Sequence, residues 1–434
     1  MKRLAAALPV LLCWLSPLAA QEPLQNRDAE PAATAIQPPA REKPPADDWG
    51  FRWEDHPRLQ LGDGTWIDFR ARVQADLRES EAEIGDPSAF DVSRRRVGIE
   101  GRIAGLADYQ VEYEIASDEP WRDVYIDYRR FNHLQVQAGK FKLPFSLDEN
   151  TSSTNLDFVY RSGVANQLAP GRDRGVMVHG RVFRVLQYEA GVFKHDGGNA
   201  RTNNPERVFA GTTTAGRVTV QPYRSSKSRL SDLQFGVAFT GGDVPEGIAA
   251  MRGRTALDAP FFPSDLWVRG HRRRVGLEAR WRPGPFSVKA EYIRVETERR
   301  GQSVEDADLS PLLGTGWYVS GTWLATGERK SSGGDNPRRP MFRGGFGAVE
   351  FAVRLEALGF RSSATDGVPS TSPRADVVLG NRDRATTFGV NWYPFRGIKI
   401  QANTIREQFS EPVRSPLPSQ PGYWSHVLRL QLSL

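Results

Sequence analysis

The stretch Trp66–Leu77 reads WIDFRARVQADL and alternates without a break between apolar and polar side chains. The apolar side chains occupy the odd positions: Ile67, Phe69, Ala71, Val73, Ala75 and Leu77. The polar side chains occupy the even positions: Asp68, Arg70, Arg72, Gln74 and Asp76. Successive side chains of a strand point to opposite faces of a sheet, so this pattern predicts a strand with one apolar and one polar face.

The same period of two recurs along the chain, and we count sixteen segments that carry it. They lie at 66–77, 97–103, 109–115, 122–129, 134–139, 176–182, 186–193, 215–221, 233–239, 271–281, 286–295, 317–324, 349–356, 388–393, 398–405 and 424–434. Short connections, such as 105–108 and 282–285, alternate with long polar ones, such as 240–270, 296–314 and 327–345. An even number of strands with short turns on one side and long loops on the other is typical of an outer-membrane barrel.

The two ends of the chain support this interpretation. The last residues, His426–Leu434, alternate up to the terminal carboxylate, which predicts a strand that closes the barrel and removes its last open edge. Outside the N-terminus there is no run of 18 apolar residues, so no transmembrane helix is expected. A secreted sandwich, propeller or β-helix is the alternative, but no repeat of fixed period indicates one. The predicted fold class is therefore all-β, a transmembrane antiparallel barrel of about sixteen strands.

The N-terminal region divides into two segments before the barrel. Residues 1–20 combine Lys2 and Arg3 with an apolar stretch and small residues at Ala19 and Ala20, which predicts a secretory signal peptide. Residues 21–55 are rich in Pro and Ala and predict a flexible periplasmic segment, followed by a barrel domain at 56–434. The only cysteine, Cys13, lies in the leader, so no disulfide and no cysteine metal site are expected.

The segment Leu134–Arg174 begins as an alternating strand and then loses its period for roughly thirty residues. Loops longer than about 12–15 residues are uncommon in compact domains and usually carry function. In a barrel, such a loop can fold inward and narrow the lumen, so we predict that this segment is the constriction loop. Its charged residues are Lys140, Lys142, Asp148, Glu149, Arg161, Arg172 and Arg174.

Strand parity also predicts which charged side chains face the lumen. The basic residues expected along an anion path are Arg70, Arg72, Arg94, Arg96, Arg102, Arg272, Arg274, Arg280 and Lys289. Basic residues gather in two walls, whereas the third and fourth strands are acidic. The first wall is Arg70 and Arg72 with 94–96 on the first two strands, and the second is 271–274 on the tenth. Arginine binds phosphate with two parallel hydrogen bonds and stays charged at physiological pH, which favours an anion path. However, the polar faces taken together are nearly neutral, and a basic wall opposite an acidic one also suits an unselective channel.

No pattern indicates an enzyme, a cofactor, a metal site or nucleic-acid binding. The six histidines are scattered and none has the spacing H-x-x-x-H. There is no G-x-S-x-G motif and no G-x-x-x-x-G-K-[ST] loop. A barrel hydrolase would need a nucleophile, a histidine and a carboxylate to converge in space, and this alternative stays open.

Several stretches of the chain form a specific set of motifs. The most specific are AGKFKLPFSLDENTSS and DFVYRSGVANQLAPGRDRGV within Ala138–Val176, and they are joined by RRRVGIEGRI at Arg94–Ile103 and GWYVSGTWLATGE at Gly316–Glu328. With these stretches, the chain resembles the phosphate- and polyphosphate-selective outer-membrane porins, the porin O and P family, from about Leu59 to Leu434. The final Leu434 departs from the aromatic residue that this family places last, which concerns recognition by the barrel-assembly machinery.

The resemblance implies a barrel of sixteen strands, usually a homotrimer, in the outer membrane of a Gram-negative bacterium. It further implies an inward-folded third loop and basic side chains that pass phosphate-like anions. We therefore expect a porin for passive diffusion of small anions, phosphate or oligophosphates first, in contact with outer-membrane lipid. A weakly selective general porin of the same fold is the first alternative, and a barrel with an adhesin, receptor or hydrolase role is the second.

Overall fold

The computed structural model describes residues 49–53, 56–82, 89–115, 117, 119–198, 211–248, 253–262, 266–331, 336–362, 378–417 and 420–434. The predicted signal peptide at 1–20 and most of the predicted flexible segment at 21–55 lie outside these residues. The end of that segment, Gly50–Trp53, is described and forms strand β1. Within the described ranges, no helix has the length and apolar character needed to cross a membrane.

The main sheet contains 18 strands, of which β1 and β2 (Pro57–Gln60) form a hairpin attached to the start of β3. The other sixteen form a closed antiparallel barrel, because the last strand, β20, pairs with β3 from Ser425↔Ser80 to Ser433↔Arg72. Its strands are β3 (Trp66–Ser80), β4 (Phe90–Ile103), β5 (Ala107–Glu114), β6 (Trp121–Phe131), β7 (Leu134–Lys142), β8 (Arg172–Val182), β9 (Leu186–Phe193), β10 (Thr213–Val220), β11 (Gln234–Ile248), β14 (Trp267–Trp281), β15 (Phe286–Arg299), β16 (Leu309–Leu324), β17 (Ala348–Ser362), β18 (Asn381–Tyr393), β19 (Ile398–Phe409) and β20 (Gly422–Ser433). The predicted fold class and strand number are confirmed.

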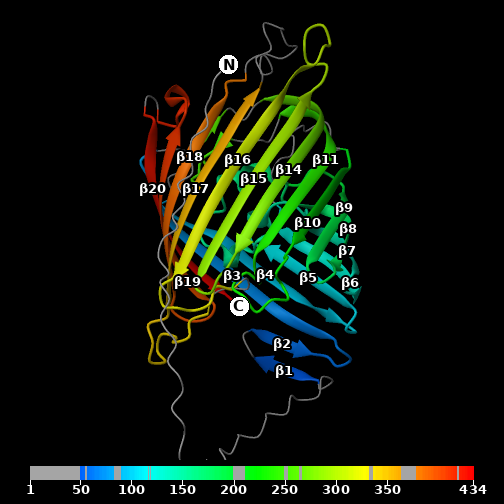
Figure 1. Ribbon diagram of the computed structural model, residues 1–434, viewed down its shortest axis with the longest axis vertical. Coiled ribbons are helices and arrows are strands. Elements are labelled where there is room, and N and C mark those ends of the chain that lie inside the picture. The colour runs from blue at the N-terminus through cyan, green and yellow to red at the C-terminus, as the bar shows by residue number, and fades with distance from the viewer. Residues whose placement is uncertain are drawn as a thin grey trace, which may run out of the picture. The chain divides into compact units, whose positions relative to one another are not determined.

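The barrel wall is uneven in height (Figure 1). Strands β5, β9 and β10 have 8 residues each, whereas β15, β16 and β17 have 14, 16 and 15. We call the wall from β5 to β10 the short wall and the wall from β14 to β20 the tall wall. In the middle of the wall, most outward side chains are apolar and exposed, as the alternation predicts; Phe351, Val353 and Leu355 of β17 are examples.

One connection runs on the side of the barrel opposite to that expected from its length. β16 ends at Leu324 and β17 begins at Ala348, so the connection between them starts and ends at the end of the barrel that holds the short turns. We call this end the turn end and the other the loop end. Polarity and glycine content predict a loop but not its side, because the side depends on the number of strands that precede it.

The interior of the barrel contains a hydrophobic core. It joins α2 (Gly163–Leu168) of the β7–β8 loop to β13 (Pro260–Phe262) of the β11–β14 loop and to the tall wall. Val164, Leu168 and Phe261 are almost fully buried in it. Phe262 stacks on Phe360 of β17 with ring centroids 4.8 Å apart. Apolar packing thus occupies the tall-wall side of the lumen. The polar cavity described below lies against the first strands of the barrel instead.

Candidate functional site: a basic cavity at the constriction

The β7–β8 loop, residues 143–171, folds into the barrel, and we call it L3. Gly139 precedes it with φ of +136°, and a Cβ there would lie 2.2 Å from the Val124 carbonyl oxygen, so only glycine fits this position. Helix α1 (Leu147–Asn150) then begins with a cap in which Ser146 Oγ accepts the Glu149 amide at 3.1 Å. The inward course predicted for this loop is therefore present.

Side chains of the tall wall hold the backbone of L3. The carboxylate of Glu291 on β15 accepts the amides of Leu147 and Asp148 at 2.7 and 2.8 Å. The carboxylate of Glu356 on β17 accepts the Gly163 amide at the start of α2 at 2.8 Å. Both carboxylates sit at helix N-termini, where unsatisfied amides attract negative charge.

Asp157 is the most strongly held residue of L3. Its carboxylate lies 2.6 Å from Lys289 Nζ on β15 and 2.9 Å from Lys330 Nζ in the turn-end connection. Lys330 also pairs with Glu350 of β17. Burial alone would raise the pKa of Asp157, but the two lysines hold that pKa well below the ordinary range of an aspartate.

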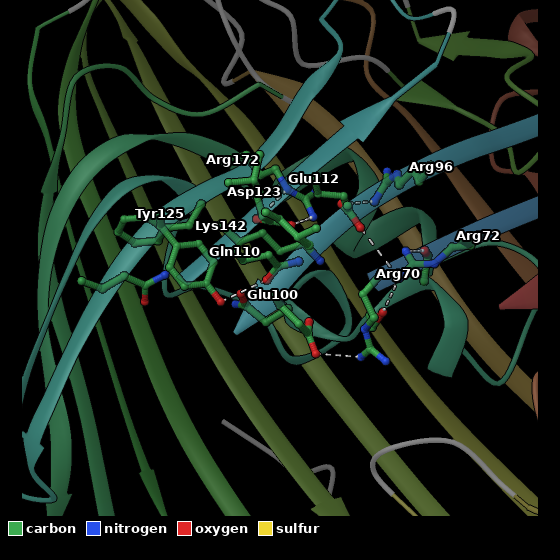
Figure 2. A pocket seen from close by; sticks show the side chains of 18 of the residues that line it. Arg70, Arg72, Arg96, Glu100, Gln110, Glu112, Asp123, Tyr125, Lys142 and Arg172 are labelled. Carbon is green, nitrogen blue, oxygen red and sulfur yellow. Dashed lines mark hydrogen bonds and ion pairs between the residues drawn. The ribbon is translucent and has the colours of Figure 1, made fainter. Parts of the chain in front are cut away.

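L3 and the first strands enclose a cavity of about 390 Å³ (Figure 2). Its basic residues are Arg70 and Arg72 of β3, Arg94 and Arg96 of β4, Lys142 of β7, Arg161 of L3 and Arg172 of β8. Its acidic residues are Glu100, Glu112, Asp123 and Glu189. The arginines of β3 and β4 occupy the polar, inward-facing positions of these strands, and L3 closes the opposite side of the cavity. The cavity therefore carries an excess of positive charge.

Most of these cations already have a carboxylate partner. Arg96 Nη1 lies 2.8 Å from Glu112 Oε2, and Arg172 binds Asp123 through two bonds of 3.0 and 2.6 Å. Arg70 lies 3.1 Å from Glu100. These pairs fix the arginines in place, as the dashed lines of Figure 2 show. A buried guanidinium that is held in this way needs little rearrangement to meet an ion in the lumen.

Arg94 differs from the others. Among the described residues, no carboxylate lies within ion-pair distance of its guanidinium, and its nearest charged neighbours include Arg72, Arg96 and Arg161. Like charges this close repel one another, and an anion bound between them would relieve the repulsion. Arg94 is thus the strongest anion-binding candidate in the cavity.

The L3 cations are bound to the loop itself. Glu149 lies 3.2 Å from Arg161 and 3.7 Å from Lys142. Burial would raise the pKa of Glu149, but these two charges lower it below the usual value for a glutamate. Arg161 also donates to the Thr151 carbonyl at 2.7 Å. Glu149 therefore stays ionised and holds Arg161 and Lys142 at the cavity.

Five basic residues predicted for the anion path lie outside the cavity. Arg272 and Arg274 are buried against Asp196, with Arg272 Nη1 2.7 Å from its carboxylate, so they anchor the β9–β10 loop. Lys289 holds Asp157, and Arg102 binds Asp108 at 2.6 Å. Arg280 lies 3.8 Å from Asp232 and also donates to Gln234. Parity places these side chains on the inner face, but it contains no information about depth or partner.

The predicted loop residues also separate into two groups. Lys142, Asp148, Glu149, Arg161 and Arg172 belong to L3 or its hinges; Asp148 accepts the Ser162 amide at 2.8 Å. Lys140 and Arg174 stand opposite each other in the register, with the outward parity of Val136 and Val176. Lys140 reaches Glu119 at 3.4 Å instead. β7 and β8 continue beyond the residues whose alternation marks them as strands in the sequence. Lys140 and Arg174 therefore belong to the strands, on their outer face, and not to the loop.

Sequence reasoning missed two contributors. Tyr125 lines the cavity and donates to Gln110 at 3.0 Å, and its position on the polar face of β6 was an available signal. Lys330 lies in a connection without periodicity, so nothing in the sequence linked it to Asp157. Alternation does place Arg429 of β20 on the polar face, but it does not predict that its side chain donates to the Val159 carbonyl at 2.6 Å and binds Asp76.

Comparisons with known proteins agree with this barrel. The family profile described as "Phosphate-selective porin O and P" matches residues 67–412. Porin O of Pseudomonas aeruginosa is 24% identical over 331 residues, which cover 69% of this chain and 72% of that protein. The trimer form of OmpT of Vibrio cholerae has a TM-score of 0.54 at 11% identity, covering 85% of this chain and 99% of that chain. The channel DcaP of Acinetobacter baumannii has a TM-score of 0.52 at 11% identity, covering 86% and 98%. The two solved structures show a shared barrel fold alone.

Proposed function

Because the chain belongs to the phosphate-selective porin O and P family, we propose that it passes small anions, phosphate first, along the basic cavity. It is an outer-membrane porin, and its barrel crosses the membrane of a Gram-negative cell. The family is one of channels, which supports a transport role over an adhesin, receptor or hydrolase role. The short turns of such barrels face the periplasm and the longer loops face the exterior.

The observation that carries the proposal is the charge inside the cavity. Seven basic side chains meet four carboxylates there, and Arg94 has no carboxylate partner among the described residues. Arginine forks match phosphate geometry, and Arg70, Arg72 and Arg96 surround the same space. We propose that a phosphate-like anion pauses beside Arg94 and then moves on to the turn end.

The test is the zero-current potential of the purified protein in a planar bilayer across a KCl gradient. Arg94→Glu changes the local charge by two units, which at about 8 Å in a water-like dielectric alters the energy of a monovalent ion by about 1 kcal/mol. The anion is destabilised and a cation is stabilised by this amount, so each permeability changes about fivefold and the anion-to-cation permeability ratio should fall by roughly 30-fold. The matched control is Arg95→Glu, because the neighbouring side chain is exposed and faces outward.

Phosphate selectivity needs a second measurement on the same channels. Phosphate added at millimolar concentration should reduce chloride current in the wild type and in Arg95→Glu, and much less in Arg94→Glu. A potential near zero without phosphate block would support the weakly selective general porin instead. The observation that favours this second candidate is the presence of Glu100, Glu112, Asp123 and Glu189 in the same cavity.

We also propose a homotrimer that associates through the short wall. An 8-residue strand tilted by about 40° rises only about 20 Å, less than the apolar band of about 25 Å that outer-membrane barrels present. Lys140 and Arg174 stand on the outer face near the loop end of this wall. A protein partner would shield both features from lipid. The trimer form of OmpT supports this assembly.

A further inference from the structure

Two buried carboxylates near the loop end of the tall wall take no part in the proposed passage of anions. They belong to Asp383 of β18 and Glu407 of β19, residues that are only 6% and 1% exposed. Glu407 stands opposite Ala385, the next inward residue after Asp383, so the two carboxylates are diagonal neighbours on the inner face. Diagonal neighbours lie within reach of each other's long side chains. The two negative charges therefore share one part of the interior and repel each other.

No cation of the described residues compensates these charges. Neither carboxylate has an arginine, lysine or histidine within ion-pair distance in that part of the chain, and Arg354 of β17 pairs with Glu356 instead, at 3.2 Å. Asp383 Oδ1 and Glu407 Oε2 also lack a hydrogen-bond partner among the described residues. Burying a charge without a partner is costly, because little water remains to solvate it. The pair therefore requires a ligand that brings positive charge.

A third buried oxygen atom faces the same space. Tyr423 of β20 stands opposite Glu407 in the register and is fully buried. Its hydroxyl group is close enough to Glu407 and Asp383 to interact with them electrostatically, yet it forms no hydrogen bond of ordinary geometry with a described residue. A phenol can donate a hydrogen bond to a carboxylate oxygen, and here it does not. Three buried oxygen atoms without hydrogen-bond partners thus belong to neighbouring side chains on three adjacent strands.

The β11–β14 loop covers these side chains inside the barrel. The Ala256 amide of this loop donates to Glu407 Oε1 at 2.7 Å. Phe261 of the same loop lies against Phe409 with ring centroids 5.8 Å apart, and Phe409 stacks on Tyr423 at 5.9 Å. The carboxylates therefore border the hydrophobic core, where the low dielectric makes a compensating charge valuable.

We propose that Asp383, Glu407 and Tyr423 bind a calcium ion that fixes the β11–β14 loop inside the barrel. Two carboxylates match the charge of a divalent cation, and carboxylate and hydroxyl oxygens are hard ligands of the kind that Ca²⁺ prefers. Ca²⁺ accepts irregular sets of about six to eight oxygen atoms, whereas Mg²⁺ demands near-octahedral geometry. Within the described ranges, no three His, Cys, Asp or Glu side chains are arranged for a metal, so the tyrosine hydroxyl is an essential part of this site.

The position of the site agrees with a calcium ion taken up from outside the cell. The loop end of such a barrel faces the exterior. Extracellular calcium sites bind with dissociation constants of about 0.1–1 mM, and we expect an affinity in this range. The ion removes the repulsion between Asp383 and Glu407, and Glu407 passes the effect to the loop through its hydrogen bond with Ala256.

The test measures binding of radioactive Ca²⁺ to the purified, delipidated protein in detergent by equilibrium dialysis. The double variant Asp383→Asn with Glu407→Gln keeps the side-chain shapes but removes both charges, and it should bind at least tenfold more weakly than the wild type. Tyr423→Phe removes only the hydroxyl group and should weaken binding by a smaller factor. The matched control, Asp258→Asn with Glu411→Gln, removes two exposed carboxylates from neighbouring loops and should change the affinity less than twofold.

A second arm follows the loop itself. Removal of Ca²⁺ by EGTA should make brief closures more frequent in single-channel records of the wild type and should leave the double variant unchanged. Each variant is first checked for a folded barrel by heat-modified migration and for the zero-current potential of the wild type.

Three outcomes would overturn the proposal. If the wild type binds no more Ca²⁺ than the double variant, the two carboxyl groups share a proton instead of an ion. If the control loses as much affinity as the double variant, the ion sits on the exposed loops. If Ca²⁺ binds but EGTA leaves the wild-type records unchanged, the ion does not fix the β11–β14 loop.

Discussion

At the scale of single residues, Arg94 and Arg95 show how far sequence reasoning reaches. Alternation places Arg94 on the polar face, and the structure has it in the cavity, whereas its neighbour Arg95 is exposed on the other face of the strand. Alternation does not distinguish Arg94, which has no ion-pair partner among the described residues, from Arg274, which is buried against Asp196. That difference depends on the β9–β10 loop, whose position no local pattern encodes.

The ion pairs of Asp157 give the sharpest prediction at this scale. Lys330→Met removes one of its two lysines and leaves both Asp157 and Glu350 buried and undercompensated. Breaking a buried pair in this way costs about 3–5 kcal/mol. We expect a lower urea midpoint and frequent conductance substates in single-channel records. The control is Lys330→Met combined with Glu350→Gln, which removes one undercompensated charge, leaves the Lys289–Asp157 pair intact and should recover part of the loss; no recovery would contradict the assignment.

The same contact predicts a pH dependence. The pKa of Asp157 is lower in the folded protein than in the unfolded chain, so its contribution is fully present above the ordinary aspartate pKa and is lost as pH falls through the folded value. The difference in channel noise between the wild type and Asp157→Asn should therefore stay constant from pH 8 to about 4 and disappear only under stronger acid. In the Lys330→Met background, the remaining lysine lowers the pKa less, and this difference should disappear at a higher pH.

At the scale of elements, the sequence predicts every barrel strand but ends most of them too early at the loop end. β11 continues to Ile248 and β15 to Arg299, beyond the expected 239 and 295. The reason is physical: near the loop end the outward side chains leave the apolar band, so they no longer need to be apolar and the alternation disappears. Backbone pairing continues without it.

Helix α2 of L3 provides a prediction for one element. It packs on β16 at Gly316, where a Cβ would lie 2.8 Å from the Val164 side chain. Gly316→Val should push α2 toward the open side of the lumen and lower single-channel conductance. Gly321→Val, on the outer face of the same strand, has open space and should leave conductance unchanged. Equal conductance in both variants would show that α2 does not border the passage.

At the scale of the whole molecule, closure of the barrel follows from alternation up to the last residues, whereas the filling of its interior does not. The hydrophobic core of L3, β13 and the tall wall uses residues from loops without periodicity. Phe261 and Leu168 lie in short apolar stretches of two different loops, and only the closed barrel brings them together. The sequence therefore indicates that L3 folds inward, but it does not indicate that the β11–β14 loop packs on L3.

The short wall yields a prediction about assembly. A spin label at Val192→Cys, on exposed β9, should be immobile and poorly accessible to oxygen in bilayers if that wall lies between subunits. A label at Val353→Cys, on the tall wall, should be readily accessible because it faces lipid. The predicted leader holds the only native cysteine, so neither label has a competitor in the remaining chain. Equal oxygen accessibility at the two positions would place the subunit interface elsewhere.

The hydrophobic core inside the barrel has a consequence for how such a channel can diversify. One half of the circumference, from β14 to β20, carries the packing that keeps L3 in place, and the other half carries most of the charges that meet the cargo. Substitutions on β3 to β6 can therefore change which ions pass without disturbing the packing. Loop insertions can be tolerated where they contact neither the hydrophobic core nor the cavity. This division of labour lets new specificities arise on an architecture that stays intact.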